Sequence, residues 1–169
     1  MVFKTKKTNM NMVGVERVFA IFKAINGRYP KLDVHDDRLN IQKLTYMLQS
    51  LSLPFHYRFN WYFKGPYSPT LASEAFGYVE KGIDKGIELT VEEKKAVSEL
   101  QLAFSRDITE PNKLELYASL LFLKKQNKWN FSEDGEKLAD KLVSLKPWFT
   151  REDATSAIAT LKNSGIFGS

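Results

Sequence analysis

The sequence predicts a mainly helical domain with a small antiparallel β-sheet, an α+β fold. Two observations carry this prediction: apolar residues recur at helical spacing along most of the 169-residue chain, and one stretch, Phe55 to Lys64, alternates with period two. A hydrophobic content of 43% suffices for a core, and no apolar run approaches the about 20 residues that span a bilayer. We expect one compact helical domain over residues 11–165, preceded by a flexible basic N-terminus over residues 1–10.

Helix start and stop signals divide the domain into seven predicted helices. They cover residues 13–25, 39–51, 69–81, 91–104, 112–126, 133–145 and 151–164. The expected N-caps are Asp36 or Asp37, Ser68, Thr90, Ser132 and Thr150. Gly27 is expected to end the first helix, and Pro111 to open the fifth.

The segment from Phe55 to Lys64 is the clearest predicted strand. Its odd positions are all aromatic (Phe55, Tyr57, Phe59, Trp61, Phe63), whereas its even positions are mostly polar (His56, Arg58, Asn60, Tyr62, Lys64). This alternation predicts that the odd face packs on the core and the even face meets solvent. Gly65-Pro66 is expected to form a turn. Because a strand needs a partner, residues 86–89 and 128–131 are the candidate partner strands.

The C-terminal half also has the element order of a winged-helix unit. Two helices, at 91–104 and 112–126, precede a short strand at 128–131 and a Gly-containing turn that leads into another helix. In that interpretation the helix at 112–126 would be the recognition helix. Its apolar residues occupy almost all faces, however, which is typical of a buried helix and argues against DNA readout.

The charge of the chain is unevenly distributed. Residues 1–65 hold 11 Lys and Arg against 4 Asp and Glu, whereas residues 66–169 hold 14 against 16. A basic N-terminal third favours a polyanion or an acidic protein as partner, although an ordinary solvated surface shows the same pattern. One hypothesis is therefore a nucleic-acid-binding module. Its phosphate contacts would come from Lys4, Lys6, Lys7, Arg58 and Lys64.

Catalytic motifs are missing from the sequence. The chain has no cysteine, which excludes a disulfide framework, a thiolate metal site and a cysteine nucleophile. Its two histidines, His35 and His56, lack metal-ligand spacing, and there is no phosphate loop, nucleophile elbow or dinucleotide motif. We expect no catalytic residues, no metal site, no cofactor and a cytoplasmic location.

An enzymatic alternative rests on one acidic segment. Asp33, Asp36 and Asp37 lie together before the second predicted helix and could hold a divalent cation for a nuclease-like reaction. The same carboxylates are also typical of a helix N-terminus, where they cap the helix and interact with its dipole. The second interpretation is favoured because one short loop supplies few fixed ligands.

Two motifs within residues 38–80 resemble a known family. Their residues are Ile41-Gln42-Lys43-Leu44, Tyr46, Trp61-Tyr62, Gly65-Pro66-Tyr67-Ser68 and Leu71. They resemble the signature of the Panacea antitoxin domain, and still more that of its YwgA-type prokaryotic relatives. The resemblance implies a compact helical domain with a small sheet and, for Panacea, a non-enzymatic role in which the domain neutralises a toxin.

These observations favour a non-enzymatic binding protein, antitoxin-like or related to prokaryotic, archaeal or viral defence, that acts by masking a protein partner such as a toxin. The candidate partner-binding residues are Lys43, Tyr46, Arg58, Asn60, Tyr62, Lys64 and Tyr67. Lys43, Tyr46 and Tyr67 are motif positions whose polar ends are expected to be free. The others belong to the even face of the predicted strand, where basic and aromatic groups can anchor a protein or stack on bases. We expect no membrane partner, and the sequence predicts no oligomeric state.

Overall fold

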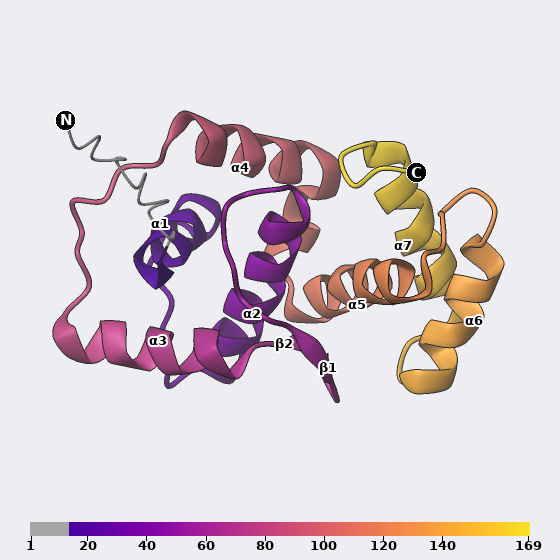
Figure 1. Ribbon diagram of the computed structural model, residues 1–169, viewed down its shortest axis with the longest axis horizontal. Helices are drawn as coiled ribbons and strands as arrows, with labels where there is room; N and C mark the ends of the chain where they lie inside the picture. Colours follow the sequence, from indigo (N-terminus) through magenta and orange to yellow (C-terminus); the bar gives the residue numbers. More distant parts are fainter. Residues whose placement is uncertain (1–13) are drawn as a thin grey trace, which may run out of the picture.

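Seven α-helices, a short 3-10 helix η1 (Ser105–Thr109) and one β-hairpin are the regular elements in the part of the chain that the computed structural model describes, residues 14–169 (Figure 1). The helices are α1 (Val15–Asn26), α2 (His35–Ser50), α3 (Pro69–Lys81), α4 (Val91–Phe104), α5 (Pro111–Asn127), α6 (Gly135–Leu145) and α7 (Arg151–Ser164). The hairpin consists of β1 (Asn60–Tyr62) and β2 (Gly65–Tyr67). The predicted fold class is thus confirmed. The flexible tail expected over residues 1–10 lies outside the described residues.

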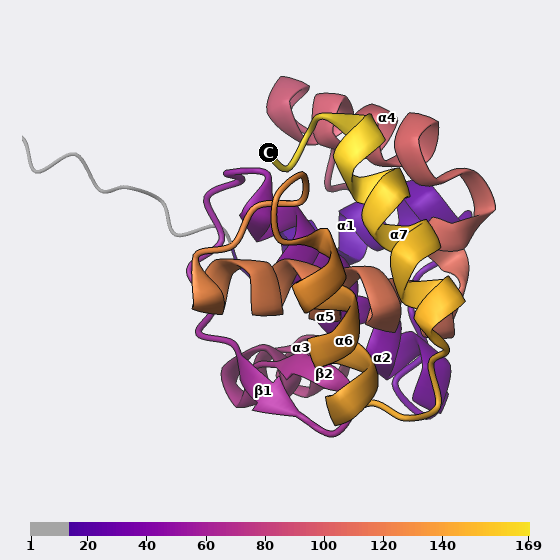
Figure 2. The same ribbon diagram turned by 90° about the vertical axis from the view of Figure 1, so that its right-hand side faces the viewer.

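Helix α5 is the central element of the fold. It contacts α2, α6, α7 and β2 (Figures 1 and 2), and it is buried along most of its length. Its burial follows from apolar residues on nearly every face. The prediction that this helix is buried is therefore confirmed, and it cannot act as a recognition helix.

The winged-helix interpretation of the C-terminal half is wrong. Residues 128–131 form a turn instead of a strand, and the hairpin is the only sheet in the described range 14–169. Lys128 ends α5 in the left-handed conformation (φ 55°), and the Trp129 N–H donates to the Lys124 carbonyl at 3.0 Å. This helix-closing hydrogen bond turns the chain where an extended strand was expected.

Most of the expected helix ends are confirmed. Ser68 caps α3, Thr90 and Thr150 form capping boxes, Gly27 closes α1 in the left-handed conformation, and Pro111 opens α5.

Two expected N-caps are wrong. Helix α2 begins at His35, with Val34 at the N-cap position. Asp37 therefore lies inside the first turn, where its carboxylate accepts from Arg28 and from the Lys31 backbone N–H instead of capping the helix. Helix α6 begins behind Asp134, because the Asn130 side chain accepts hydrogen bonds from the backbone N–H groups of Ser132 and Glu133 and holds them in a turn.

The hairpin replaces the longer predicted strand. Only Asn60–Tyr62 of the segment is a strand, and it pairs antiparallel with Gly65–Tyr67. The predicted partners at 86–89 and 128–131 are wrong, because the chain turns back at residues 63–64, two residues earlier than the expected Gly65-Pro66 turn. Pro66 is tolerated in an edge strand because its missing N–H faces away from the partner.

The alternating burial of this segment is nevertheless largely confirmed. Phe55 and Tyr57 are buried, whereas His56 and Arg58 are exposed. Phe63 is the exception: it lies in the hairpin turn with 73% of its surface exposed, although its odd position predicted a core residue.

The buried apolar side chains form one continuous core that draws on all seven helices. No helix within residues 14–169 combines the length and the apolar character that crossing a membrane requires.

Candidate protein-binding surface

The two motifs of the sequence contact each other in the structure. Gln42, on α2, accepts a hydrogen bond from the Ser68 backbone N–H through Oε1 (2.8 Å) and donates one from Nε2 to the Ser68 carbonyl (3.0 Å). The neighbouring Lys43 donates from Nζ to the Pro66 carbonyl (2.8 Å). Together these bonds attach the second strand of the hairpin and the start of α3 to α2.

Lys43 is buried beneath the hairpin, with 1% of its surface exposed. The pKa of its ammonium group is lowered to about 7, mainly by burial; the nearby Glu115 carboxylate opposes this shift, and repulsion from Lys146 and Lys64 adds to it. The expectation that the polar end of Lys43 is free is therefore wrong. Its role in the motif is to hold the hairpin.

A buried ion pair supports the hairpin from the side of α5. The Lys146 ammonium lies 2.9 Å from Glu115 Oε1 and donates to the Phe63 carbonyl at 2.5 Å. It also lies 4.9 Å from the ring centroids of both Trp61 and Trp148. Lys146 and Glu115 are almost fully buried, so the pair is shielded from water and salt. The hairpin turn is thus fixed to α5 and to the segment after α6.

Gly65 fits tightly against α5. Its φ is 90°, a conformation that side chains other than glycine rarely adopt, and a Cβ atom at this position would lie 2.6 Å from Ser119 Oγ. The glycine of the Gly-Pro motif is therefore required by close packing of the hairpin on α5.

The hairpin presents aromatic rings to solvent. We call Tyr62, Phe63, Tyr67 and Trp148 the hairpin aromatic surface. The rings of Phe63 and Trp148 lie 4.8 Å apart, and those of Tyr62 and Tyr67 lie 5.1 Å apart. Trp148 is 39% exposed and Tyr62 45% exposed. Lys64 Nζ lies over both Phe63 and Trp148, at 5.6 and 5.0 Å from the ring centroids, which gives the surface a cationic edge.

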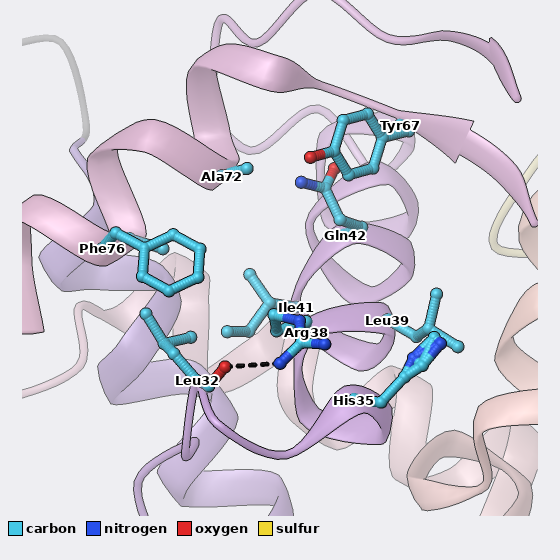
Figure 3. A pocket seen from close by; sticks show the side chains of 10 residues that line it. Leu32, His35, Arg38, Leu39, Ile41, Gln42, Tyr67, Ala72 and Phe76 are labelled. Carbon is cyan, nitrogen blue, oxygen red and sulfur yellow. Dashed lines mark hydrogen bonds between the residues drawn. The ribbon is translucent and has the colours of Figure 1, made fainter.

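An apolar groove between α2 and α3 adjoins this surface. Its volume is about 250 Å³, and Tyr67 belongs both to its lining and to the hairpin aromatic surface (Figure 3). Phe76 forms part of its wall and is 51% exposed. The ionisable lining groups besides Tyr67 are His35 and Arg38, and no Asp or Glu lines the groove. We call this feature the α2–α3 groove.

The predicted site residues divide into three groups. Asn60 and Tyr62 share one face of the hairpin with Tyr67, as the strand register requires, and Lys64 follows in the turn. Lys43 is buried below them. The other two predicted residues line a different hollow, together with Phe122 and Lys125: Tyr46, which is only 6% exposed, and Arg58. Lys4, Lys6 and Lys7 lie outside the described residues.

Three residues of the surface and the adjoining groove were missed by the sequence analysis. Phe63 was assigned to the core by the alternation, and Trp148 lies 85 positions from it in a segment without a motif. Phe76 falls among ordinary apolar positions of the third helix. A pattern of local spacing cannot indicate that Phe63 and Trp148 meet, because only the fold brings α6 to the hairpin.

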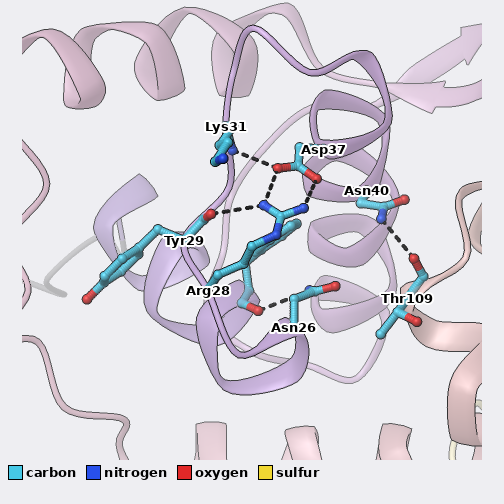
Figure 4. Close-up of polar contacts among 8 residues, drawn as sticks. Asn26, Arg28, Tyr29, Lys31, Asp37, Asn40 and Thr109 are labelled. Carbon is cyan, nitrogen blue, oxygen red and sulfur yellow. Dashed lines mark hydrogen bonds and ion pairs between the residues drawn. The ribbon is translucent and has the colours of Figure 1, made fainter.

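Asp37, in the first turn of α2, is held by structural contacts (Figure 4). Both oxygens of the Asp37 carboxylate accept from Arg28, at 2.6 and 2.9 Å, and the Lys31 backbone N–H donates to it at 2.7 Å. Burial alone raises the pKa of Asp37, but these donors outweigh it and hold the pKa below its usual value. Within the described residues, no group of three or more His, Asp and Glu is arranged to hold a metal ion.

Comparison with known proteins adds no relative to this description: no protein-family model, no curated protein and no solved structure matches the chain. The similarity to the Panacea and YwgA-type families therefore stays a prediction that rests on the motif residues around Gln42 and Gly65.

Proposed function

We propose that this chain is a non-enzymatic protein-binding module, antitoxin-like in its action, which masks a protein partner with the hairpin aromatic surface and the adjoining α2–α3 groove. The observation that carries the proposal is the exposure of Phe63 and Trp148 side by side at the hairpin. The motif resemblance supports the same function.

The composition of the surface favours a protein as the ligand. Exposed aromatic rings that contact one another are uncommon on a free surface, and Trp and Tyr supply most of the strongest contacts in protein interfaces. The rings are also held in place before binding, since Lys146 and Lys43 fix the backbone of the hairpin. A rigid aromatic surface loses little conformational entropy when a partner binds.

The charges around the surface indicate the chemistry of the partner. Lys64 lies at one edge, with its Nζ 3.7 Å from Glu115 Oε2, and His35 and Arg38 line the α2–α3 groove, to which residues 14–169 contribute no acidic side chain. We infer that the partner presents an apolar side chain to the groove, flanked by Asp or Glu residues that meet Arg38 and Lys64.

Site-specific photo-crosslinking in the native host tests this proposal. A photoreactive amino acid would replace Phe63 in one variant and Leu102 in a matched control, because Leu102 is also apolar and is 86% exposed on α4. We expect one partner to be crosslinked from position 63 and not from position 102. The partner would then be purified and its affinity for the unmodified chain measured by calorimetry.

Three results would contradict the proposal. One is a set of crosslinks from position 63 that matches the set from position 102. The other is a purified crosslinked protein that has no measurable affinity for the unmodified chain. Crosslinking between two copies of this chain would assign the surface to self-association and would also overturn the proposed masking function.

A further inference from the structure

A second surface, between the C-terminal ends of α2 and α5, differs in chemistry from the hairpin. Two adjoining hollows of about 450 and 500 Å³ share Tyr46, Gln49 and Lys125 in their linings. We call them together the α2–α5 groove. Arg58 reaches the groove from the extended segment before the hairpin, and Lys128 reaches it from the end of α5.

The groove is basic. Arg58, Lys125 and Lys128 are exposed, and none of them forms an ion pair with any residue in the described part of the chain. Lys124 also lines the groove, but its ammonium group donates to the Phe167 carbonyl at 3.3 Å and lies over the Phe131 ring. Among the described residues, no acidic side chain lines either hollow. Three cations are thus free to meet an anionic ligand.

Aromatic rings lie between these cations. Phe122 and Trp129 are partly exposed, and the edge of Tyr46 reaches both hollows. Phe122 lies 5.9 Å from the Tyr46 ring, and the backbone hydrogen bond from Trp129 to Lys124 fixes the second ring at the end of α5. Base-stacking platforms combine such rings with cations that follow a sugar-phosphate backbone.

We propose that the α2–α5 groove binds single-stranded nucleic acid, with Arg58, Lys125 and Lys128 on the phosphates and Phe122 and Trp129 against the bases. The concave shape favours a single strand. Proteins that read a duplex insert a protruding helix or ribbon into its groove, whereas a hollow lined by rings accepts unstacked bases. This site is separate from the proposed protein-binding surface and does not depend on it.

Fluorescence anisotropy of the full chain with labelled oligothymidine of about 12 nucleotides, and with the matching duplex, tests the proposal. We expect the single strand to bind more tightly than the duplex. Between about 50 and 200 mM salt, the affinity should fall with a log–log slope of about −2, which three phosphate contacts predict for single strands.

Charge-reversal variants test whether the single strand binds in the α2–α5 groove. Lys125→Glu and Arg58→Glu should each weaken binding by at least about tenfold and make the salt slope shallower by about 0.7. Lys94→Glu is the matched control, since Lys94 is exposed in the first turn of α4, where a glutamate is tolerated.

Three results would overturn the proposal. They are no binding of the single strand at low salt, equal or tighter binding of the duplex, and equal effects of Lys125→Glu and Lys94→Glu. The last result would assign any affinity to the overall charge of the chain instead of to the groove.

Discussion

The carboxamide of Gln42 pairs with both backbone polar groups of Ser68, accepting from its N–H at 2.8 Å and donating to its carbonyl at 3.0 Å. Gln42 and Ser68 are both buried, so water cannot satisfy the Ser68 N–H and carbonyl. The Gln42 carboxamide makes the two hydrogen bonds that a neighbouring strand would otherwise make with this backbone. Ser68 also caps α3. One side chain of α2 thus sets the position of both the hairpin and the next helix.

Replacing Gln42 with alanine should therefore destabilise the fold. Gln42→Ala leaves a buried N–H and a buried carbonyl without partners, at a cost of about 1–3 kcal/mol for each group. We expect the free energy of unfolding in urea to fall by at least about 2 kcal/mol. Gln126→Ala, at an exposed position of α5, should stay within about 0.5 kcal/mol of the wild type, and equal effects of the two substitutions would refute the role of Gln42.

Two glycine substitutions should change the stability in opposite directions. Gly65→Ala forces a Cβ atom to 2.6 Å from Ser119 Oγ at a φ of 90°, and we expect a loss of about 1–3 kcal/mol. Gly77→Ala, within α3, meets no atom within 4 Å and should stabilise the chain by about 0.5–1 kcal/mol. Thermal unfolding of both variants measures the difference. A neutral Gly65→Ala substitution would show that the hairpin can move away from α5.

The buried ion pair behind the hairpin should matter more than an exposed one. Glu115→Gln leaves the buried Lys146 ammonium without its counter-charge, and we expect a loss of about 3–5 kcal/mol in the free energy of unfolding. Glu99→Gln removes the partner of Lys95, which is exposed, and should cost less than about 0.5 kcal/mol. Urea titrations of the two variants test this order, and similar losses would mean that water reaches the Glu115 site.

Lys43 should make the stability depend on pH. Its pKa is about 7 in the folded protein, against 10.5 for the unperturbed group. Below pH 7 the residue is protonated in both states, and burial of the charge destabilises the fold in full. Between pH 7 and 10.5 the folded state binds fewer protons than the unfolded state, so the free energy of unfolding should rise with pH, by up to about 1.4 kcal/mol per unit.

Urea titrations at about pH 7, 8 and 9 measure this effect. Lys43→Met should have a shallower rise than the wild type, whereas Lys94→Met, at an exposed position, should keep the wild-type slope. Glu115, Lys64 and Lys146 face the same site and remain in both variants. The pKa of Lys146 is itself lowered, mainly by burial, so some rise should persist. If the free energy of unfolding rose equally with pH in the wild type and in Lys43→Met, the result would contradict the lowered pKa of Lys43.

The fold was predictable where local patterns determine it. Helical spacing and capping residues located the helices within a few residues, and the all-round apolar character of α5 indicated its burial. The length of the strand was overestimated. The alternation from Phe55 to Lys64 indicates that one face of an extended segment is buried and the other exposed, but it does not indicate hydrogen bonding to a neighbouring strand. Gln49 holds Tyr57 by bonds to its backbone N–H and carbonyl, so this segment is extended without belonging to a sheet.

The site was less predictable than the fold. The sequence analysis singled out Gln42 and Lys43 as motif residues, but it expected the polar end of Lys43 to be free. A lysine in a sequence gives no sign that it will be buried against a carbonyl. Tyr62 and Tyr67 were named as candidate binding residues from local features: Tyr62 lies on the even face of the predicted strand, and Tyr67 belongs to the Gly65-Pro66-Tyr67-Ser68 motif. Trp148 was not, because its contact with Phe63 depends on how α6 packs against α5, which no local spacing encodes.

The affinity of the partner crosslinked at position 63 for two alanine variants tests the central claim most directly. The account predicts that Phe63→Ala weakens binding by at least about 30-fold, as expected for a residue at the centre of an interface, while Leu102→Ala binds like the wild type. Circular dichroism would verify that both variants are folded. Equal affinities of Phe63→Ala and the wild type would contradict the assignment of the hairpin aromatic surface as the binding site.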